Sequence, residues 1–151
     1  MGRIHNPMDN FFGKEDRLLG VDYGEKRVGI AITDPLMMFA SPLKTINNDQ
    51  RFWEEFLLLF DEYQITKIVL GYPLKESGEA SSSTRLVEKF RAELEKRVKV
   101  PIEYSDERYS SDIAMQRIIE SVPSKKKRRD KGLVDKNAAA IILQDYLDLG
   151  S

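Results

Sequence analysis

Cysteine is absent from this 151-residue chain, and histidine occurs only once, as His5. The absence of cysteine excludes disulfide bonds, cysteine metal sites and cysteine nucleophiles, and it is compatible with a reducing cytosol. The single histidine has no metal-ligand pattern around it. A catalytic histidine is therefore not expected, and His5 is interpreted as a solvated tail residue.

Long apolar runs are also missing. None approaches the roughly 20 residues of a membrane-spanning helix, and residues 1–16 lack the apolar core of a secretory signal. A cytoplasmic location without a membrane partner is the resulting expectation. An excess of charge is missing too, since 24 basic and 25 acidic residues give a net charge of −1. Binding to nucleic acid would therefore depend on a local patch of charge.

The residues that are present are those of a folded domain. Hydrophobic residues make up 41% of the chain and charged residues 32%, which excludes wholesale disorder. The length is that of one domain with a substantial core. We expect residues 1–16 to form an N-terminal extension of unassigned role and residues 17–149 to form a single domain.

The chain is organised around residues 17–34. Two short apolar runs, Leu18–Val21 and Val28–Ile32, flank a polar turn that contains Gly24. This pattern is typical of a β-hairpin, in which Gly24 can supply a backbone conformation with positive φ.

Strand alternation predicts which side chains of the hairpin share a face. Gly20 and Asp22 fall on one face, and Leu19 and Val21 fall on the other. A face of small residues beside a lone acid leaves room for something to approach. Asp22 is equally well explained, at this point, as a turn residue at the end of a strand. The second strand also has one face of small residues: Gly29, Ala31 and Thr33.

The rest of the chain alternates strand and helix patterns. A weak strand is predicted at residues 40–46, where Pro42 favours an edge or a bulge. Further strands are predicted at residues 67–71 and from about 102 to 106, and a loop is predicted at residues 72–83. Helices are predicted at 51–63, around 86–98, at 113–122 and after Asp135. This order indicates an α/β protein whose mixed sheet carries helices on its faces.

Three acidic positions stand at the ends of these elements: Asp22, the pair Asp106 and Glu107, and Asp135. Carboxylates that converge repel one another, and hard cations such as Mg²⁺ or Mn²⁺ stabilise such clusters. Two such ions about 4 Å apart can bind a phosphate, activate a water and stabilise the leaving oxygen. The acids therefore suggest a metal-dependent hydrolase of phosphodiesters.

Two of these acids have ordinary structural explanations. Alternation sends Asp106 and Glu107 to opposite faces, so only one of them is expected to bind metal. We favour Glu107 because of its longer side chain, although a salt bridge with Arg108 would also explain it. Taken alone, Asp135 is better explained as the N-cap of the last helix.

A run of five basic residues lies in a predicted loop over residues 123–136. With Lys26, Arg27 and Arg108, this run is a candidate for contacts to a nucleic-acid backbone. A solvated loop is the alternative, and a loop that orders on a phosphate backbone would satisfy both interpretations. The run consists of Lys125, Lys126, Lys127, Arg128 and Arg129.

Four motifs occur together in order: VDYGEKRVGIAITD, IVLGYP with a Ser/Gly loop after it, DER, and VDKNAAAIILQDYL. In this combination the chain resembles the YqgF/RuvX family of Holliday-junction-resolvase-like nucleases. The resemblance implies a ribonuclease H-like α/β fold, a mixed five-stranded sheet with helices on both faces. It also implies that Asp22, Glu107 and Asp135 take the places of the family's acidic triad.

The same resemblance implies a metal-dependent nuclease in maturation of the 5′ end of precursor 16S rRNA, with precursor rRNA or the ribosome as partner. Resolution of branched DNA is the older proposal for the family. A non-catalytic RNA-binding or ribosome-binding module on the same fold is a third possibility. The sequence leaves open the choice between RNA and DNA, and also the oligomeric state.

Overall fold

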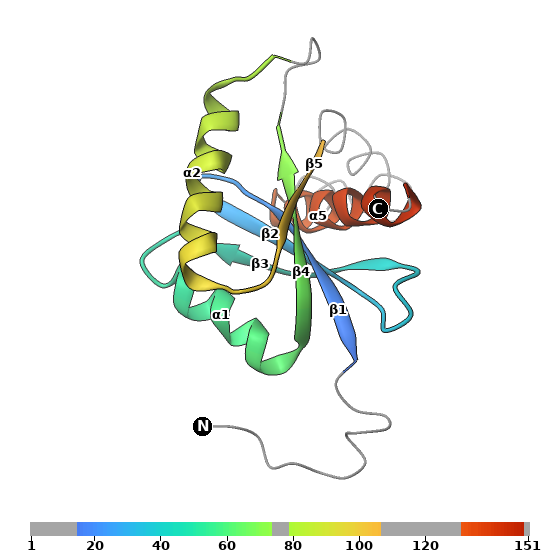
Figure 1. Cartoon of the computed structure of the whole chain (residues 1–151). Helices are drawn as coiled ribbons and strands as arrows, with labels where there is room; N and C mark the ends of the chain where they lie inside the picture. Colours follow the sequence, from blue (N-terminus) through green and yellow to red (C-terminus); the bar gives the residue numbers. More distant parts are fainter. Residues whose placement is uncertain (1–14, 74–78, 107–130, 150–151) are drawn as a thin grey trace.

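The computed structural model describes residues 15–73, 79–106 and 131–149. Its centre is a five-stranded sheet with the strand order β3-β2-β1-β4-β5 (Figure 1). No helix in the described ranges is both long and apolar enough to cross a membrane. The elements are β1 (Asp16–Asp22), β2 (Arg27–Thr33), β3 (Ala40–Asn47), α1 (Phe52–Glu62), β4 (Gln64–Tyr72), α2 (Ser82–Arg97), β5 (Ile102–Asp106) and α5 (Lys131–Asp148).

The sheet is mixed, as predicted. Strand β1 pairs antiparallel with β2 and parallel with β4, and β4 in turn pairs parallel with β5. The carboxyl ends of β1, β4 and β5 therefore meet at one edge of the sheet. Strand β3 lies at the outside, and its pairing with β2 shifts register beside Pro42. The expectation that proline would confine this strand to an edge or a bulge is confirmed.

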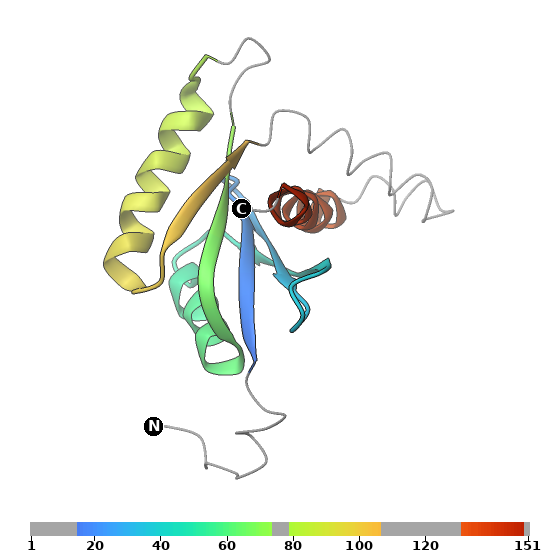
Figure 2. The same cartoon turned by 45° about the vertical axis from the view of Figure 1, so that its right-hand side comes forward.

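Helices cover both faces of the sheet. Helices α1 and α2 pack on one face and α5 crosses the other (Figures 1 and 2). Leu19 and Val21 belong to the core on the α1 and α2 side, whereas Ala31 and Val69 pack against α5. Burial of these apolar side chains is the main force that holds the helices on the sheet.

The small side chains on one face of the hairpin are explained by close packing of a helix at Gly20. A Cβ atom at this position would lie 2.8 Å from the Cβ of Leu143 and 3.0 Å from the backbone oxygen of Ala139. The predicted face is thus confirmed, and what approaches it at Gly20 is helix α5.

The start of the last helix differs from the prediction. Helix α5 begins at Lys131, four residues before Asp135, so residues 131–136 are helical and the N-cap interpretation of Asp135 is wrong. Gly132 suggested a loop, but a glycine within a helix costs only about 1 kcal/mol relative to alanine. Packing of the helix on the sheet can offset this cost. The helix predicted at 113–122 lies outside the described residues.

Helix α2 also begins earlier than its apolar pattern indicated. Ser81 accepts a hydrogen bond from the backbone N–H of Thr84 at 3.4 Å, and the Thr84 hydroxyl accepts one from the backbone N–H of Ser81 at 2.9 Å. This capping box satisfies N–H groups that the helix leaves unpaired. The predicted loop at 72–83 is therefore too long at both ends, because Tyr72 ends β4 and Ser82 starts α2.

Candidate functional site

The edge where β1, β4 and β5 end carries two of the predicted acids. Asp22 is the last residue of β1 and Asp106 is the last residue of β5, with β4 between them. Neighbouring strands lie about 4.8 Å apart, so two spacings separate their backbones by roughly 10 Å. Asp22 is half-buried and Asp106 is exposed.

Strand alternation places these two acids on opposite faces. Asp22 shares the α5 face with Gly20, which lies under that helix. On β5, Glu103 bonds to a residue of α5, so Asp106, three positions later, faces the α1 and α2 side. Asp106 is therefore poorly placed to join Asp22. Glu107 and Arg108 lie outside the described residues, and their roles stay predictions.

Helix α5 carries the third predicted acid toward the same edge. Tyr146, near the end of the helix, contacts Lys67 in the first half of β4. Ala139, two turns earlier, lies over Gly20 in the second half of β1. The helix therefore points its first turns toward the edge where the strands end, and the backbone of Asp135 lies one turn before Ala139.

The donor set of the predicted site suits a hard divalent cation. Asp22, Glu107 and Asp135 would offer only carboxylate oxygens, the donors that Mg²⁺ and Mn²⁺ prefer. Among the residues with described side chains, no three His, Asp or Glu groups lie close enough to hold a metal. Asp22 is among these residues, whereas its two predicted partners are not.

The β1–β2 turn is fixed by its neighbours. A Cβ atom on Gly24 would lie 2.4 Å from the backbone oxygen of Arg27. The glycine is thus required by a close approach of two backbone segments, and the positive φ expected from the sequence is not adopted. The Asn48 side chain donates to the Gly24 carbonyl and its backbone N–H donates to the Lys26 carbonyl, both at 2.9 Å. These hydrogen bonds fix the backbone of the turn, which contains Lys26 and leads into β2 at Arg27. The basic run at 125–129 lies outside the described residues.

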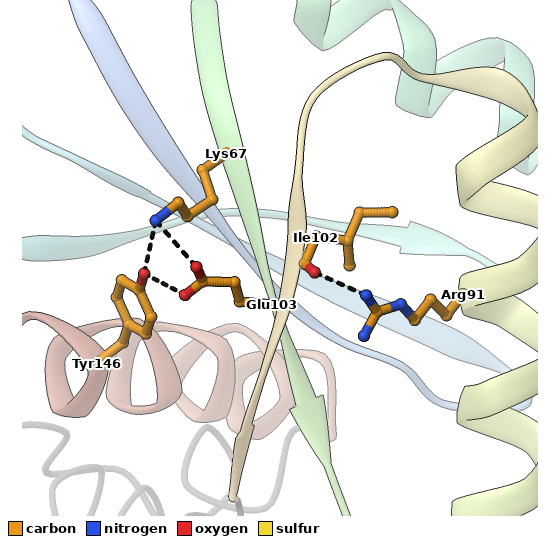
Figure 3. Close-up of polar contacts among 5 residues, drawn as sticks. All are labelled: Lys67, Arg91, Ile102, Glu103 and Tyr146. Atoms are coloured by element: carbon orange, nitrogen blue, oxygen red, sulfur yellow. Dashed lines mark hydrogen bonds and ion pairs between the residues drawn. The ribbon is translucent and has the colours of Figure 1, made fainter. Parts of the chain in front are cut away.

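Sequence reasoning missed a polar clasp between α5 and the sheet (Figure 3). Lys67 donates to the Tyr146 hydroxyl at 2.8 Å and forms an ion pair with Glu103 at 3.2 Å, and the Tyr146 hydroxyl donates to Glu103. Arg91 of α2 holds β5 from the other side by donating to the Ile102 carbonyl at 2.9 Å. The clasp joins residues far apart in the chain, and no local pattern signals it.

The clasp changes the titration of its charged members. The hydrogen bond from Tyr146, followed by that from Lys67, lowers the pKa of Glu103 below its ordinary value. The hydrogen bond with Tyr146 and the nearby Glu103 carboxylate raise the pKa of Lys67, against the effect of burial. Both charged forms are thus favoured in the folded protein.

Tyr146→Phe should lower the free energy of unfolding by about 1 kcal/mol at neutral pH, because it removes the hydroxyl that two charged groups share. The loss should shrink in acid. A carboxyl group with a lowered pKa stabilises the fold above its unfolded-state pKa, and this contribution is lost as the pH falls through the folded-state pKa. Urea unfolding of both proteins at neutral and acidic pH measures this difference.

Tyr63→Phe is the matched control for that substitution. Both rings have a cation over them, the Lys67 ammonium 5.4 Å from the centre of Tyr146 and the Arg17 guanidinium 5.6 Å from the centre of Tyr63, but the described residues show no hydrogen bond to the Tyr63 hydroxyl. Its substitution should change stability little at either pH. An equal loss in both variants would contradict the role given to the clasp.

The chain is similar in sequence to known proteins over most of its length. Residues 16–149 match the family model RuvX, described as Holliday junction resolvase. The chain is 41% identical over 134 residues to a protein of Flavobacterium psychrophilum named "Putative pre-16S rRNA nuclease", which covers 87% of this chain and 96% of that protein. A protein of Chlorobaculum tepidum with the same name is 42% identical over 135 residues, with 87% and 93% covered.

Solved structures show the same fold at low sequence identity. Thermus thermophilus RuvC, in a complex with a Holliday junction substrate, aligns with a TM-score of 0.52 at 13% identity over 90% of this chain and 96% of that chain. The Holliday junction resolvase of Fowlpox virus aligns with a TM-score of 0.53 at 13% identity over 89% and 99%. The ribonuclease H-like fold predicted from the sequence is confirmed.

Proposed function

This chain belongs to the RuvX family, and from that membership we propose that it is a nuclease that hydrolyses phosphodiester bonds in precursor 16S rRNA during maturation of its 5′ end. The observation that carries the proposal is the identity of about 40% to relatives named for this activity over almost their whole length. Asp22 lies at the edge where three parallel strands end, a position that suits a carboxylate that binds a metal ion. The proposal includes a cytoplasmic location, in keeping with the lack of cysteine.

The acidic residues of the chain would bind the metal, and its basic residues would bind the nucleic acid. Asp22, Glu107 and Asp135 would hold Mg²⁺ or Mn²⁺, because these ions prefer oxygen donors. Such ions, when bound, supply positive charge that lowers the pKa of a water and neutralises charge on the phosphate.

The basic groups would orient the nucleic acid against this edge. Lys26 lies in the turn after Asp22 and Arg27 begins β2, and their charges would meet phosphates beside the scissile one. Arg108 and the basic run at 125–129 would extend this contact along the backbone.

Cleavage of branched DNA is a second candidate function. The family description and the fold shared with a junction-bound resolvase favour it. Both substrates present phosphodiesters to the same acids, so the distinction lies in the shape of the nucleic acid.

We expect the purified protein to cleave a precursor 16S rRNA fragment faster than a four-way-junction DNA. Cleavage should stop with a chelator and return when Mg²⁺ or Mn²⁺ is added in excess, because the acids alone cannot neutralise the charge on the phosphate. Gel analysis of both substrates under matched conditions measures the rates. Faster cleavage of the junction would favour the DNA function, and binding of precursor without cleavage would favour a non-catalytic module.

A further inference from the structure

A pocket of about 260 Å³ lies between helices α1 and α2, next to the β1–β2 turn. Two of its aromatic rings, Phe52 and Phe90, are buried, and two, Tyr23 and Trp53, are half-buried. The proposed nuclease site does not use this pocket, which lies on the opposite face of the sheet from α5.

The aromatic rings hold one another in place. Trp53 stacks on Phe90 with 5.5 Å between ring centroids, and Tyr23 lies 4.5 Å from Phe90. Arg97 places its guanidinium 4.5 Å from the centre of the Trp53 ring. The walls are therefore preorganised, and a flat ligand would meet them with little loss of side-chain freedom.

The pocket and the acidic edge are joined by one turn. Tyr23 directly follows Asp22, so the two Cα atoms lie about 3.8 Å apart, while alternation sends their side chains to opposite faces. Asn48 lines the pocket and holds the turn through its hydrogen bonds to the Gly24 and Lys26 carbonyls. A nucleic-acid strand whose phosphate lies at Asp22 would thus pass the rim of the pocket.

We propose that this pocket binds one unpaired nucleobase of the nucleic acid whose phosphate lies at Asp22. The proposal rests on the proposed nuclease function and adds a binding site to it. Stacking of a base on aromatic rings contributes about 1–3 kcal/mol and tolerates different bases. The pocket therefore selects single-stranded or distorted substrate, in which a base is free to leave its stack.

The polar residues around the pocket suit a base with its phosphate. Lys89 is exposed on α2 and brings a positive charge to the rim. Glu93 forms ion pairs with Lys96 and Arg97 at 3.6 Å each, and its carboxylate oxygens can accept hydrogen bonds from the exocyclic amine of a base. The volume falls below the roughly 300–1,000 Å³ of pockets for drug-sized ligands, which favours a single base.

Trp53 is the chain's only tryptophan, so it reports on the pocket directly. We would titrate the full chain, in chelator, with a short single-stranded RNA and with an oligonucleotide of equal length that has no bases. We expect the RNA to change Trp53 fluorescence and the abasic oligonucleotide to leave it unchanged. No response to RNA, or equal responses to both, would overturn the proposal.

Substitution provides the second measurement. Trp53→Ala should weaken binding of a labelled RNA about tenfold, the fold-change that corresponds to about 1.4 kcal/mol of stacking, and should leave abasic binding unchanged. Leu58→Ala is the matched control, because Leu58 lies on the same helix but is exposed outside the pocket. Equal weakening of both ligands would contradict base binding and leave a protein partner as the pocket's occupant. If Trp53→Ala does not fold, the fluorescence titration decides alone.

These experiments separate the pocket from the nuclease proposal, since binding in chelator requires no cleavage. Discrimination against the abasic strand without any cleavage in Mg²⁺ would reject the nuclease and keep the pocket. Cleavage without such discrimination would reject the pocket and keep the nuclease.

Discussion

We expect Asp22→Asn to reduce metal-dependent cleavage at least about a hundredfold. Substitution of groups that merely orient a metal ligand costs about 10- to 100-fold in metal affinity or activity, so loss of a ligand charge should reach at least the upper value. Asparagine has nearly the same shape as aspartate, and Asp22 lies half-buried at a strand end rather than in the core. We therefore expect a small change in the urea midpoint, measured beside the cleavage rate at saturating Mg²⁺.

Asp106→Asn is the matched control. Asp106 also ends a parallel strand at this edge, but alternation turns it to the opposite face. The variant should keep its cleavage rate within a few fold. Equal loss of activity in both variants would mean that acids on both faces of this edge contribute to the site, and not only those on the α5 face. Full activity of Asp22→Asn would reject the site itself.

The faces of the hairpin could be predicted because a strand has a period of two residues. Alternation predicts Leu19 and Val21 on one face and Gly20 with Asp22 on the other, and the structure confirms the split between Leu19 and Val21 on one side and Gly20 on the other. The sequence could not identify what covers Gly20. Helix α5 lies more than a hundred residues away along the chain, and contacts at such separations leave no periodic pattern.

The clasp and the first turn of α5 were missed for two different reasons. Lys67, Glu103 and Tyr146 lie on three elements, and only the strand order brings them together. Helix α5 starts at Lys131 even though Gly132 and the basic residues before it are typical of a loop. In that case tertiary packing outweighs local propensity, as is common for helices on a sheet.

Gly20→Val should produce the largest loss of stability of any substitution considered. A Cβ alone would lie 2.8 Å from the Leu143 Cβ and 3.0 Å from the Ala139 oxygen. Neither atom can rotate away, because the oxygen belongs to the helix backbone and the Cβ is bonded directly to it. Overpacking costs about 1–3 kcal/mol and occasionally more. We expect Gly20→Ala to reach this range and Gly20→Val to exceed it, despite the better strand propensity of valine.

Ser41→Val separates overpacking from the effect of a new branched side chain in a strand. Ser41 is exposed on the outer strand β3, so its substitution should leave the urea midpoint nearly unchanged.

Gly20→Ala should also raise the Mg²⁺ concentration for half-maximal cleavage. A shift of α5 moves the backbone of Asp135 relative to Asp22 without altering either carboxylate, and metal ligands tolerate little displacement. A destabilised variant with an unchanged metal requirement would show that Asp135 does not act from α5. Substitution of this one glycine therefore tests both the packing of α5 on the sheet and the role of Asp135 as a metal ligand.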